Sequence, residues 1–353
     1  METGASKILG CIIGGACGDA LGYPVEHKKL WKIIELYGEK GICEMVLENG
    51  IAQITDDTQM TIYTAQGLIH AMQKQENYEG FVKEVHLSYL RWIISLLHNK
   101  EEMVSLYSSM FSENELAEND LLDNEGIDVK MCRGGSTFSA LLSGNRYSPS
   151  NPAPEGVRCG TIMRSAPIGI FAYQYPELAF RLGSDCGALT HGDPSAYLAA
   201  GFMCMLLSYL LQGCELEKSI YDCLDYLQKQ DSYQTLFQVL MKAINLAKSP
   251  SKKAIDDIQC IGLGWRADEN LAICLYCLLR FRTNVKEGFI ACVNHDGDSD
   301  SVGAVYGNLA GAYVGLECLP AEYVNHVQFK ELLMRQATFL SNTNKECLEK
   351  LIV

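Results

Sequence analysis

The sequence predicts an all-α fold in which residues 1–353 form one compact domain of many helices. Apolar residues recur mainly at the three- and four-residue spacing of helices, and no stretch alternates convincingly between apolar and polar side chains as half-buried strands do. No Pro-, Ser- or charge-rich linker divides the chain. With 48% hydrophobic residues, the chain has ample material for one large core.

The periodicity and the caps and breakers predict ten longer helices and two irregular segments. The acidic segment 99–130 is predicted to be a surface insertion with one short helix, and the proline-containing segment 143–158 to be a loop. The predicted helices cover residues 5–21, 58–73, 79–97, 176–187, 194–212, 216–229, 233–247, 267–282, 285–293 and 300–315.

The uncharged run Ala196–Leu211 raises the question of a membrane span. It is shorter than the roughly 20 residues that a bilayer requires. Asp193 and Pro194 supply an N-cap and a first-turn proline, and Gly213 supplies a stop, as expected for a helix of a globular protein. We therefore predict a buried helix and no membrane role.

Charge and cysteine content limit the partners and the compartment. The chain has 29 Lys and Arg against 43 Asp and Glu, and its net charge of −14 disfavours nucleic acid and anionic membranes as partners. The 15 cysteines are scattered, odd in number and set mostly among apolar residues, which predicts reduced thiols. The glycines and the aspartate in the first apolar stretch argue against a signal peptide. We expect a cytoplasmic protein.

Two predicted helices carry glycine at every fourth position. Glycine inside a helix costs about 0.5–1 kcal/mol relative to alanine, so a whole ridge of glycines needs a compensating contact. Close approach of another backbone supplies one. The first ridge is Gly10, Gly14, Gly18 and Gly22, and the second is Gly303, Gly307, Gly311 and Gly315.

Two acidic clusters about 240 residues apart are the most informative chemical feature. The first is Thr55-Asp56-Asp57-Thr58, and the second is Asp298-Ser299-Asp300-Ser301. Each opens a predicted helix, where an acidic residue can also serve as a simple cap. Carboxylates with adjacent hydroxyls are hard oxygen ligands of the kind that Mg²⁺ prefers. Together the clusters predict one site at helix ends that holds two cations.

The second cluster also begins like an EF-hand loop, with acids at Asp296, Asp298 and Asp300. Counted from Asp296, the sixth residue of such a loop should be glycine and is Ser301. The twelfth should be a bidentate glutamate and is Gly307. A calcium-binding EF-hand is therefore excluded.

Five motifs follow one another along the chain. They are Gly18-Asp19-Ala20-Leu21-Gly22, Thr55-Asp56-Asp57-Thr58, Gly160-Thr161-Ile162-Met163-Arg164, Thr190-His191 and Gly297-Asp298-Ser299-Asp300-Ser301. In this order they resemble the motifs of the ADP-ribosylglycohydrolase family, which includes dinitrogenase-reductase-activating glycohydrolases and ADP-ribosylarginine hydrolases. The resemblance spans about residues 5 to 315. It implies an all-α fold, two Mg²⁺ ions (Mn²⁺ being an alternative) and cleavage of the bond between ADP-ribose and a modified side chain or small molecule.

The resemblance also implies roles for individual residues. Glu26 matches a glutamate on a mobile flap over the site, and it joins Asp56 and Asp57 as candidates for the proton-handling group. The implied metal ligands are Thr55, Asp56, Asp57, Asp298, Asp300 and Ser301. The implied substrate-binding residues are Gly160, Thr161, His191, Trp265 and Asp268.

The form of the motifs is closer to the arginine-directed branch than to the serine-directed one, so arginine-linked ADP-ribose is the favoured substrate. Arg158 departs from the pattern, because it stands where glycine is common before the diphosphate loop. Two alternatives remain open. One is a two-metal phosphohydrolase acting on a nucleotide, and the other is a non-catalytic protein that binds ADP-ribose or a protein partner.

Overall fold

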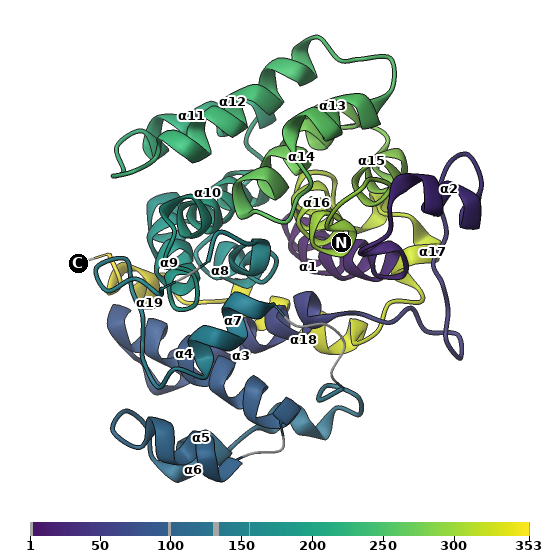
Figure 1. Cartoon of the computed structure of the whole chain (residues 1–353). Helices are drawn as coiled ribbons and strands as arrows, with labels where there is room; N and C mark the ends of the chain where they lie inside the picture. Colours follow the sequence, from purple (N-terminus) through teal and green to yellow (C-terminus); the bar gives the residue numbers. More distant parts are fainter. Residues whose placement is uncertain (1–2, 98–99, 130–133, 155, 353) are drawn as a thin grey trace.

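In the computed structural model, the regular secondary structure of the described residues consists of helices (Figure 1). The only extended pairings among these residues are isolated β-bridges, such as that between Arg158 and Arg266. The described residues are 3–97, 100–129, 134–154 and 156–352. The predicted all-α class is confirmed, and the described helices form a single domain around one large apolar core.

The helices follow one another along the chain with short connections. The α-helices are α1 (Thr3–Gly22), α2 (Leu30–Tyr37), α3 (Asp56–Lys74), α4 (Tyr78–Leu97), α5 (Lys100–Tyr107), α6 (Glu113–Ala117), α7 (Gly135–Leu141), α8 (Ala166–Phe171), α9 (Pro176–Ala188), α10 (Pro194–Leu211), α11 (Leu216–Leu227), α12 (Gln234–Lys248), α13 (Ala254–Ile261), α14 (Ala267–Arg280), α15 (Val285–Val293), α16 (Ser299–Val314), α17 (Ala321–Val324), α18 (Lys330–Ser341) and α19 (Lys345–Glu349). Short 3₁₀ helices are η1 (Tyr23–Val25), η2 (Asp120–Asp123), η3 (Cys159–Thr161) and η4 (Leu316–Cys318).

All ten helices predicted from the sequence are present, with ends within two residues of the predicted ones. The sequence analysis missed mainly short helices. One of them, α8, is buried along its whole length, so it has no polar face to produce a helical pattern. The loop predicted at 143–158 contains no helix in its described residues.

The glycine ridges of α1 and α16 pack directly against each other. Gly10 faces Gly311, Gly14 faces Gly307 and Gly18 faces Gly303, so the helices run antiparallel. The fit leaves no room for a side chain, because a Cβ on Gly14 would lie 2.3 Å from the carbonyl oxygen of its partner. The predicted close approach is confirmed, and it places the end of α1 beside the start of α16.

The two most apolar long helices are core helices. By length and composition alone, Gly4–Val25 and Pro194–Leu211 could each cross a membrane, but 89% and 83% of their apolar windows are buried inside the protein. The second of these, α10, packs against α8, α9, α11, α14 and α16. Burial in the core therefore accounts for the composition of both helices, as predicted for α10.

The acidic segment differs from the prediction. Residues 99 and 130 lie outside the described residues, and between them the chain forms two short α-helices and a 3₁₀ turn instead of one short helix. Ser112 and Glu115 form a capping box that starts α6. Met103, Tyr107 and Leu116 are buried, and α5 and α6 pack on α4 at the lower edge of Figure 1. The few buried apolar residues are scattered among acidic ones, so the sequence of this segment shows no clear helical periodicity.

Replacing Gly14 by alanine should destabilise the protein by about 1–3 kcal/mol or more, because the new methyl group would overlap the backbone of Gly307. Gly4→Ala is the matched control in the same helix, since nothing lies within 4 Å of the added Cβ. Its effect should stay within about 1 kcal/mol and favour folding. Urea unfolding of both variants measures the difference. Equal stability of Gly14→Ala and the wild type would contradict the packing described.

Candidate functional site

A cavity of about 600 Å³ opens where the end of α1, the starts of α3, α7 and α16, and the η3 loop meet. Most of the residues predicted for the site line it. These are Glu26, Asp56, Asp57, Gly160, His191, Trp265, Asp298, Asp300 and Ser301. The structure therefore brings the two acidic clusters into one cavity, although they lie far apart in the sequence.

The first cluster is held by the start of α3 and by Asp19 of α1. Thr55 is the N-cap of α3, and its side chain accepts a hydrogen bond from the backbone N–H of Asp57 at 3.2 Å. The buried carboxylate of Asp19 accepts hydrogen bonds from the backbone N–H of Thr55 and from both the N–H and the hydroxyl of Thr58. Thr55 itself does not line the cavity. Asp19 is a supporting residue that the sequence analysis quoted in a motif without giving it a role.

The second cluster is held by the turn that enters α16. The backbone N–H of Asp298 donates to the carbonyl of Leu263 at 2.9 Å, and that of Ser301 donates to Asp300 Oδ1 at 2.9 Å. Asp296, on the same turn, accepts a hydrogen bond from the backbone N–H of Leu30 at 2.6 Å. This contact ties α2, which follows the segment that carries Glu26, to the acidic turn.

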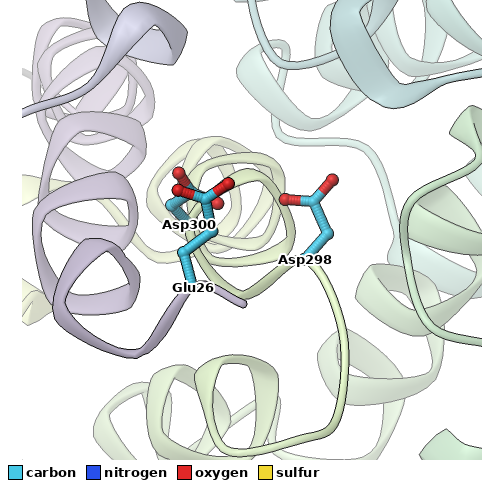
Figure 2. A group of neighbouring side chains, drawn as sticks. All are labelled: Glu26, Asp298 and Asp300. Carbon is cyan, nitrogen blue, oxygen red and sulfur yellow. The ribbon is translucent and has the colours of Figure 1, made fainter. Parts of the chain in front are cut away.

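Three carboxylates form a compact group. Ligand atoms of Glu26, Asp298 and Asp300 all lie within 4.8 Å of one another. Figure 2 shows their carboxylate groups facing the same space, with Glu26 coming from the chain after α1 and the two aspartates from the start of α16. The sequence analysis assigned Glu26 to proton transfer and did not include it among the metal ligands. In the structure, Glu26 is part of the group that could hold an ion.

Burial and mutual repulsion disfavour the charged forms of these carboxyl groups. Burial, followed by the charges of Asp19 and Glu26, raises the pKa of Asp56 to about 7. The pKa values of Asp57 and Asp300 are raised well above their usual range, first by burial and then by neighbouring carboxylates. Asp298 contributes to the shift of Asp57, and Asp57 contributes to that of Asp300, which places the two clusters within electrostatic reach of each other.

The donor set fits a hard divalent cation. The charged side chains of the two clusters are all carboxylates, and Asp57 Oδ2 is buried with no hydrogen-bond partner among the described residues. A buried carboxylate oxygen without a donor is costly unless a cation neutralises it. Oxygen ligands at this density suit Mg²⁺ or Mn²⁺.

Cys159 is a cavity residue that the sequence analysis did not assign to the site. Its Sγ–H donates to Asp298 Oδ2 at 2.8 Å, and Ser301 Oγ lies 3.5 Å from the sulfur. Burial raises the pKa of the thiol well above its usual value, and Asp298 adds to the effect. The position of Cys159 directly before Gly160 was the only signal in the sequence that could have assigned it to the site. The thiol is therefore a neutral donor that helps to orient Asp298.

The wall formed by the start of α7 was also missed. Gly134, Gly135, Ser136 and Thr137 line the cavity, and Thr137 Oγ1 is buried without a hydrogen-bond partner among the described residues. Two glycines followed by two hydroxyl residues were the signal in the sequence. No acidic or basic side chain marks this stretch, so it did not stand out.

Two residues predicted to bind substrate point elsewhere. The hydroxyl of Thr161 donates to the carbonyl of Ala196 at 2.9 Å, and neither Thr161 nor Asp268 lines the cavity. The carboxylate of Asp268 accepts two hydrogen bonds from Arg266, at 3.0 and 2.9 Å. Both side chains therefore already have protein partners. The role predicted for the loop that contains Gly160 and Thr161 is to bind a diphosphate through backbone N–H groups, which does not use the hydroxyl of Thr161.

At the mouth of the cavity, the ring of His27 stacks on Trp265, with centroids 4.9 Å apart and planes 12° apart. His27 Nε2 also lies 2.9 Å from Glu26 Oε1. His27 adopts a positive φ of 60°, a conformation that is uncommon for residues other than glycine. These contacts hold the segment that carries Glu26 against the start of α14.

A buried chain of hydrogen bonds sets the tautomer of His191. Arg164 Nη2, which can only donate, lies 2.6 Å from Thr190 Oγ1, and the same oxygen lies 2.8 Å from His191 Nδ1. Nδ1 is the only acceptor within reach of the Thr190 hydroxyl proton among the described residues. The proton therefore points to Nδ1, and Nε2 carries the ring proton on the side of Gly160.

His191 remains neutral. Burial, with a smaller contribution from the charge of Arg164, lowers its pKa to about 3. A neutral imidazole with Nε2–H facing the cavity is a hydrogen-bond donor whose state does not change near neutral pH. This arrangement suits an oxygen acceptor of a bound molecule.

Comparisons with known proteins agree with this fold. Residues 1–349 match the ADP-ribosylglycohydrolase family. The chain is 22% identical to an uncharacterized protein of Archaeoglobus fulgidus, over 95% of both chains. It is 24% identical to the ADP-ribosylarginine hydrolase Tri1 of Serratia proteamaculans, over 94% of this chain and 78% of that protein. It is 21% identical to the ADP-ribosylhydrolase ARH3 of Xenopus tropicalis, over 92% and 91%.

A solved structure, described as an ADP-ribosylglycohydrolase-related protein complex, has the same fold, with a TM-score of 0.61 over 97% of this chain and 99% of that one at 22% identity. Fold and acidic cavity define a class of all-α proteins with a carboxylate-rich site between helix ends. The chain belongs to the ADP-ribosylglycohydrolase family. The resemblance noted in the sequence is thus confirmed at the level of the family.

Replacing Thr190 by valine should release the tautomer of His191, because Nδ1 loses the hydroxyl proton that it accepts. The ¹⁵N chemical shifts of the imidazole distinguish the two nitrogens, and the variant should show a mixture of tautomers where the wild type shows Nε2–H. Thr190→Ser keeps the hydroxyl and is the matched control. An unchanged ¹⁵N pattern in the valine variant would refute the assigned chain of donors.

Proposed function

We propose that this protein hydrolyses the glycosidic bond between ADP-ribose and a modified side chain, with arginine-linked ADP-ribose as the preferred substrate. One observation carries the proposal. In a chain of the ADP-ribosylglycohydrolase family, carboxylates from both ends of the sequence line one cavity of about 600 Å³, beside a neutral histidine donor. Glycoside hydrolysis depends on closely placed carboxylates.

We infer that two Mg²⁺ or Mn²⁺ ions are held by the two clusters. Glu26, Asp298 and Asp300 would hold one ion, and the cluster at the start of α3 would complete the site with Asp57 Oδ2, which has no hydrogen-bond partner in the described part of the chain. Cations held there would supply electrostatic stabilisation and a fixed position for the ribose hydroxyls. The carboxylates of the two clusters, which form the floor of the cavity and repel one another, would then be neutralised.

The reaction adds one water across the C–N bond. A carboxylate takes a proton from the attacking water, the water oxygen bonds to the anomeric carbon, and the C–N electron pair leaves with the guanidine nitrogen, which gains a proton. Asp56, Asp57 and Glu26 all line the cavity and are the candidates for this proton transfer. Burial, and after it the charges of neighbouring carboxylates, raises the pKa of Asp56 to about 7.

Features of the sequence and one relative support the arginine linkage. The turn Gly297-Asp298-Ser299-Asp300-Ser301 has the form that favours the arginine-directed branch, and a relative of 24% identity is named an ADP-ribosylarginine hydrolase. The substrate would be an ADP-ribosylated protein or a small-molecule conjugate. We further propose a cytoplasmic location, which agrees with the free state of every cysteine in the described residues.

Asp300→Asn and Asp56→Asn should each lower the release of ADP-ribose from ADP-ribosyl-arginine by at least about a hundredfold. Asparagine keeps the shape of the side chain and removes the charge that would hold a cation. Release of ADP-ribose by chromatography measures activity. Asp222→Asn, at an exposed ion pair with Lys218, is the control and should retain full activity.

Added Mg²⁺ should stabilise the wild type, by about 2.7 kcal/mol at a hundredfold excess over its dissociation constant, and Asp300→Asn should lose this gain. Thermal unfolding with and without Mg²⁺ measures it and also shows that the variant folds.

Full turnover by both asparagine variants would overturn the site assignment. Release of phosphate without glycosidic cleavage would instead indicate a phosphohydrolase, and metal-independent binding without turnover would indicate a non-catalytic protein.

A further inference from the structure

A short antiparallel bridge beside the cavity places two arginines opposite each other. The backbone N–H of Cys159 donates to the carbonyl of Trp265 at 3.1 Å, and that of Ala267 donates to the carbonyl of Val157 at 2.9 Å. Arg158 and Arg266 are the paired residues of this bridge. Directly opposite residues of an antiparallel pair project their side chains to the same face.

Like charges in this position repel each other, so the pairing is unfavourable unless anions compensate it. For Arg266 the compensation is internal, because Asp268 accepts from both Nε and Nη2 and this contact raises the pKa of the guanidinium. Arg158 is exposed, and its guanidinium makes no hydrogen bond or ion pair in the described part of the chain. One positive charge at this bridge therefore lacks a partner among the residues that the structure describes.

Both arginines line a second, shallower cavity of about 520 Å³ together with His27, Val157 and Trp265. His27, Arg158 and Trp265 also line the main cavity, so the two cavities are continuous at the stacked rings. The floor of the main cavity carries the carboxylates, whereas its rim at this point carries the unpaired cation. The sign of the charge thus changes from floor to rim.

We propose that the cavity lined by Arg158 and Arg266 is an anion-binding subsite that holds an anionic group of the substrate during glycoside cleavage. This rests on the proposed function, because it assigns a part of the substrate to the rim of the same site. Two parts of an ADP-ribosylated protein carry suitable oxygens. One is the diphosphate of ADP-ribose, and the other is an acidic side chain close to the modified residue. Guanidinium binds both by charge-assisted hydrogen bonds.

The test compares Arg158→Gln with the wild type in two binding assays. The first uses calorimetry with ADP-ribose and with adenosine, which has no phosphate. The second uses peptides that carry ADP-ribosyl-arginine flanked by either glutamate or glutamine, with metal chelated so that the conjugate stays intact. Arg335→Gln is the matched control, since Arg335 is an exposed arginine without an ion pair in the described residues and lies on α18, in the wall of a different cavity.

If the diphosphate occupies the subsite, Arg158→Gln should bind ADP-ribose about three- to tenfold more weakly and adenosine equally well. If an acidic side chain occupies it, the wild type should prefer the glutamate-flanked peptide by a similar factor, and the variant should lose that preference. Unchanged binding by Arg158→Gln in both assays would overturn the subsite. So would a loss by Arg158→Gln that is as large for adenosine as for ADP-ribose, or a loss of the same size in Arg335→Gln. Both assays measure binding, so a failure of the hydrolase proposal would be seen separately, as no release of ADP-ribose by the wild type.

Discussion

The contact between the glycine ridges of α1 and α16 is the constraint on which the site depends. It is an antiparallel contact of backbone against backbone, with Gly14 and Gly307 too close for any side chain between them. Its geometry sets the end of one helix beside the start of the other, since Gly22 packs on Ser299 and Asp300. Glu26, which follows α1, thereby meets the acidic turn at the other end of the chain. A change that loosened the ridge would therefore also move these carboxylates apart.

Holding those carboxylates together lowers the stability of the fold, and contacts around the two clusters offset part of this cost. Each cluster sits at a helix start, where backbone N–H groups favour negative charge. Asp19 and Cys159 extend this support from outside the two clusters, the first by fixing Thr55 and Thr58, the second by donating to Asp298. The protein therefore keeps carboxylates that repel one another close together, an arrangement that a bound cation would stabilise.

The sequence predicted the long helices, the glycine contact and the meeting of the acidic clusters, because each leaves a local signal: periodicity, a regular spacing or a group of like side chains. It did not predict the contribution of Cys159, His27 or the start of α7, whose residues acquire their role only from neighbours distant in the sequence. The hydroxyl of Thr161 donates to the carbonyl of Ala196, and the role assigned to its loop, which is to bind the diphosphate through backbone N–H groups, stays a prediction. A motif locates a site more reliably than it assigns the direction of each side chain.

The charge distribution around the cavity also constrains how a substrate can enter. A chain with a net charge of −14 and a floor of carboxylates would repel the anionic diphosphate of the proposed substrate. Neutral donors near the floor, such as His191 with Nε2–H, do not offset that repulsion, although they can hold an oxygen once it arrives. The unpaired cation of Arg158 is at the rim, where the field of the floor is weaker and an anion meets it first. The guanidinium of Arg158 at the rim would then attract an entering anion first, and a metal ion on the floor would offset the repulsion between that anion and the carboxylates afterwards.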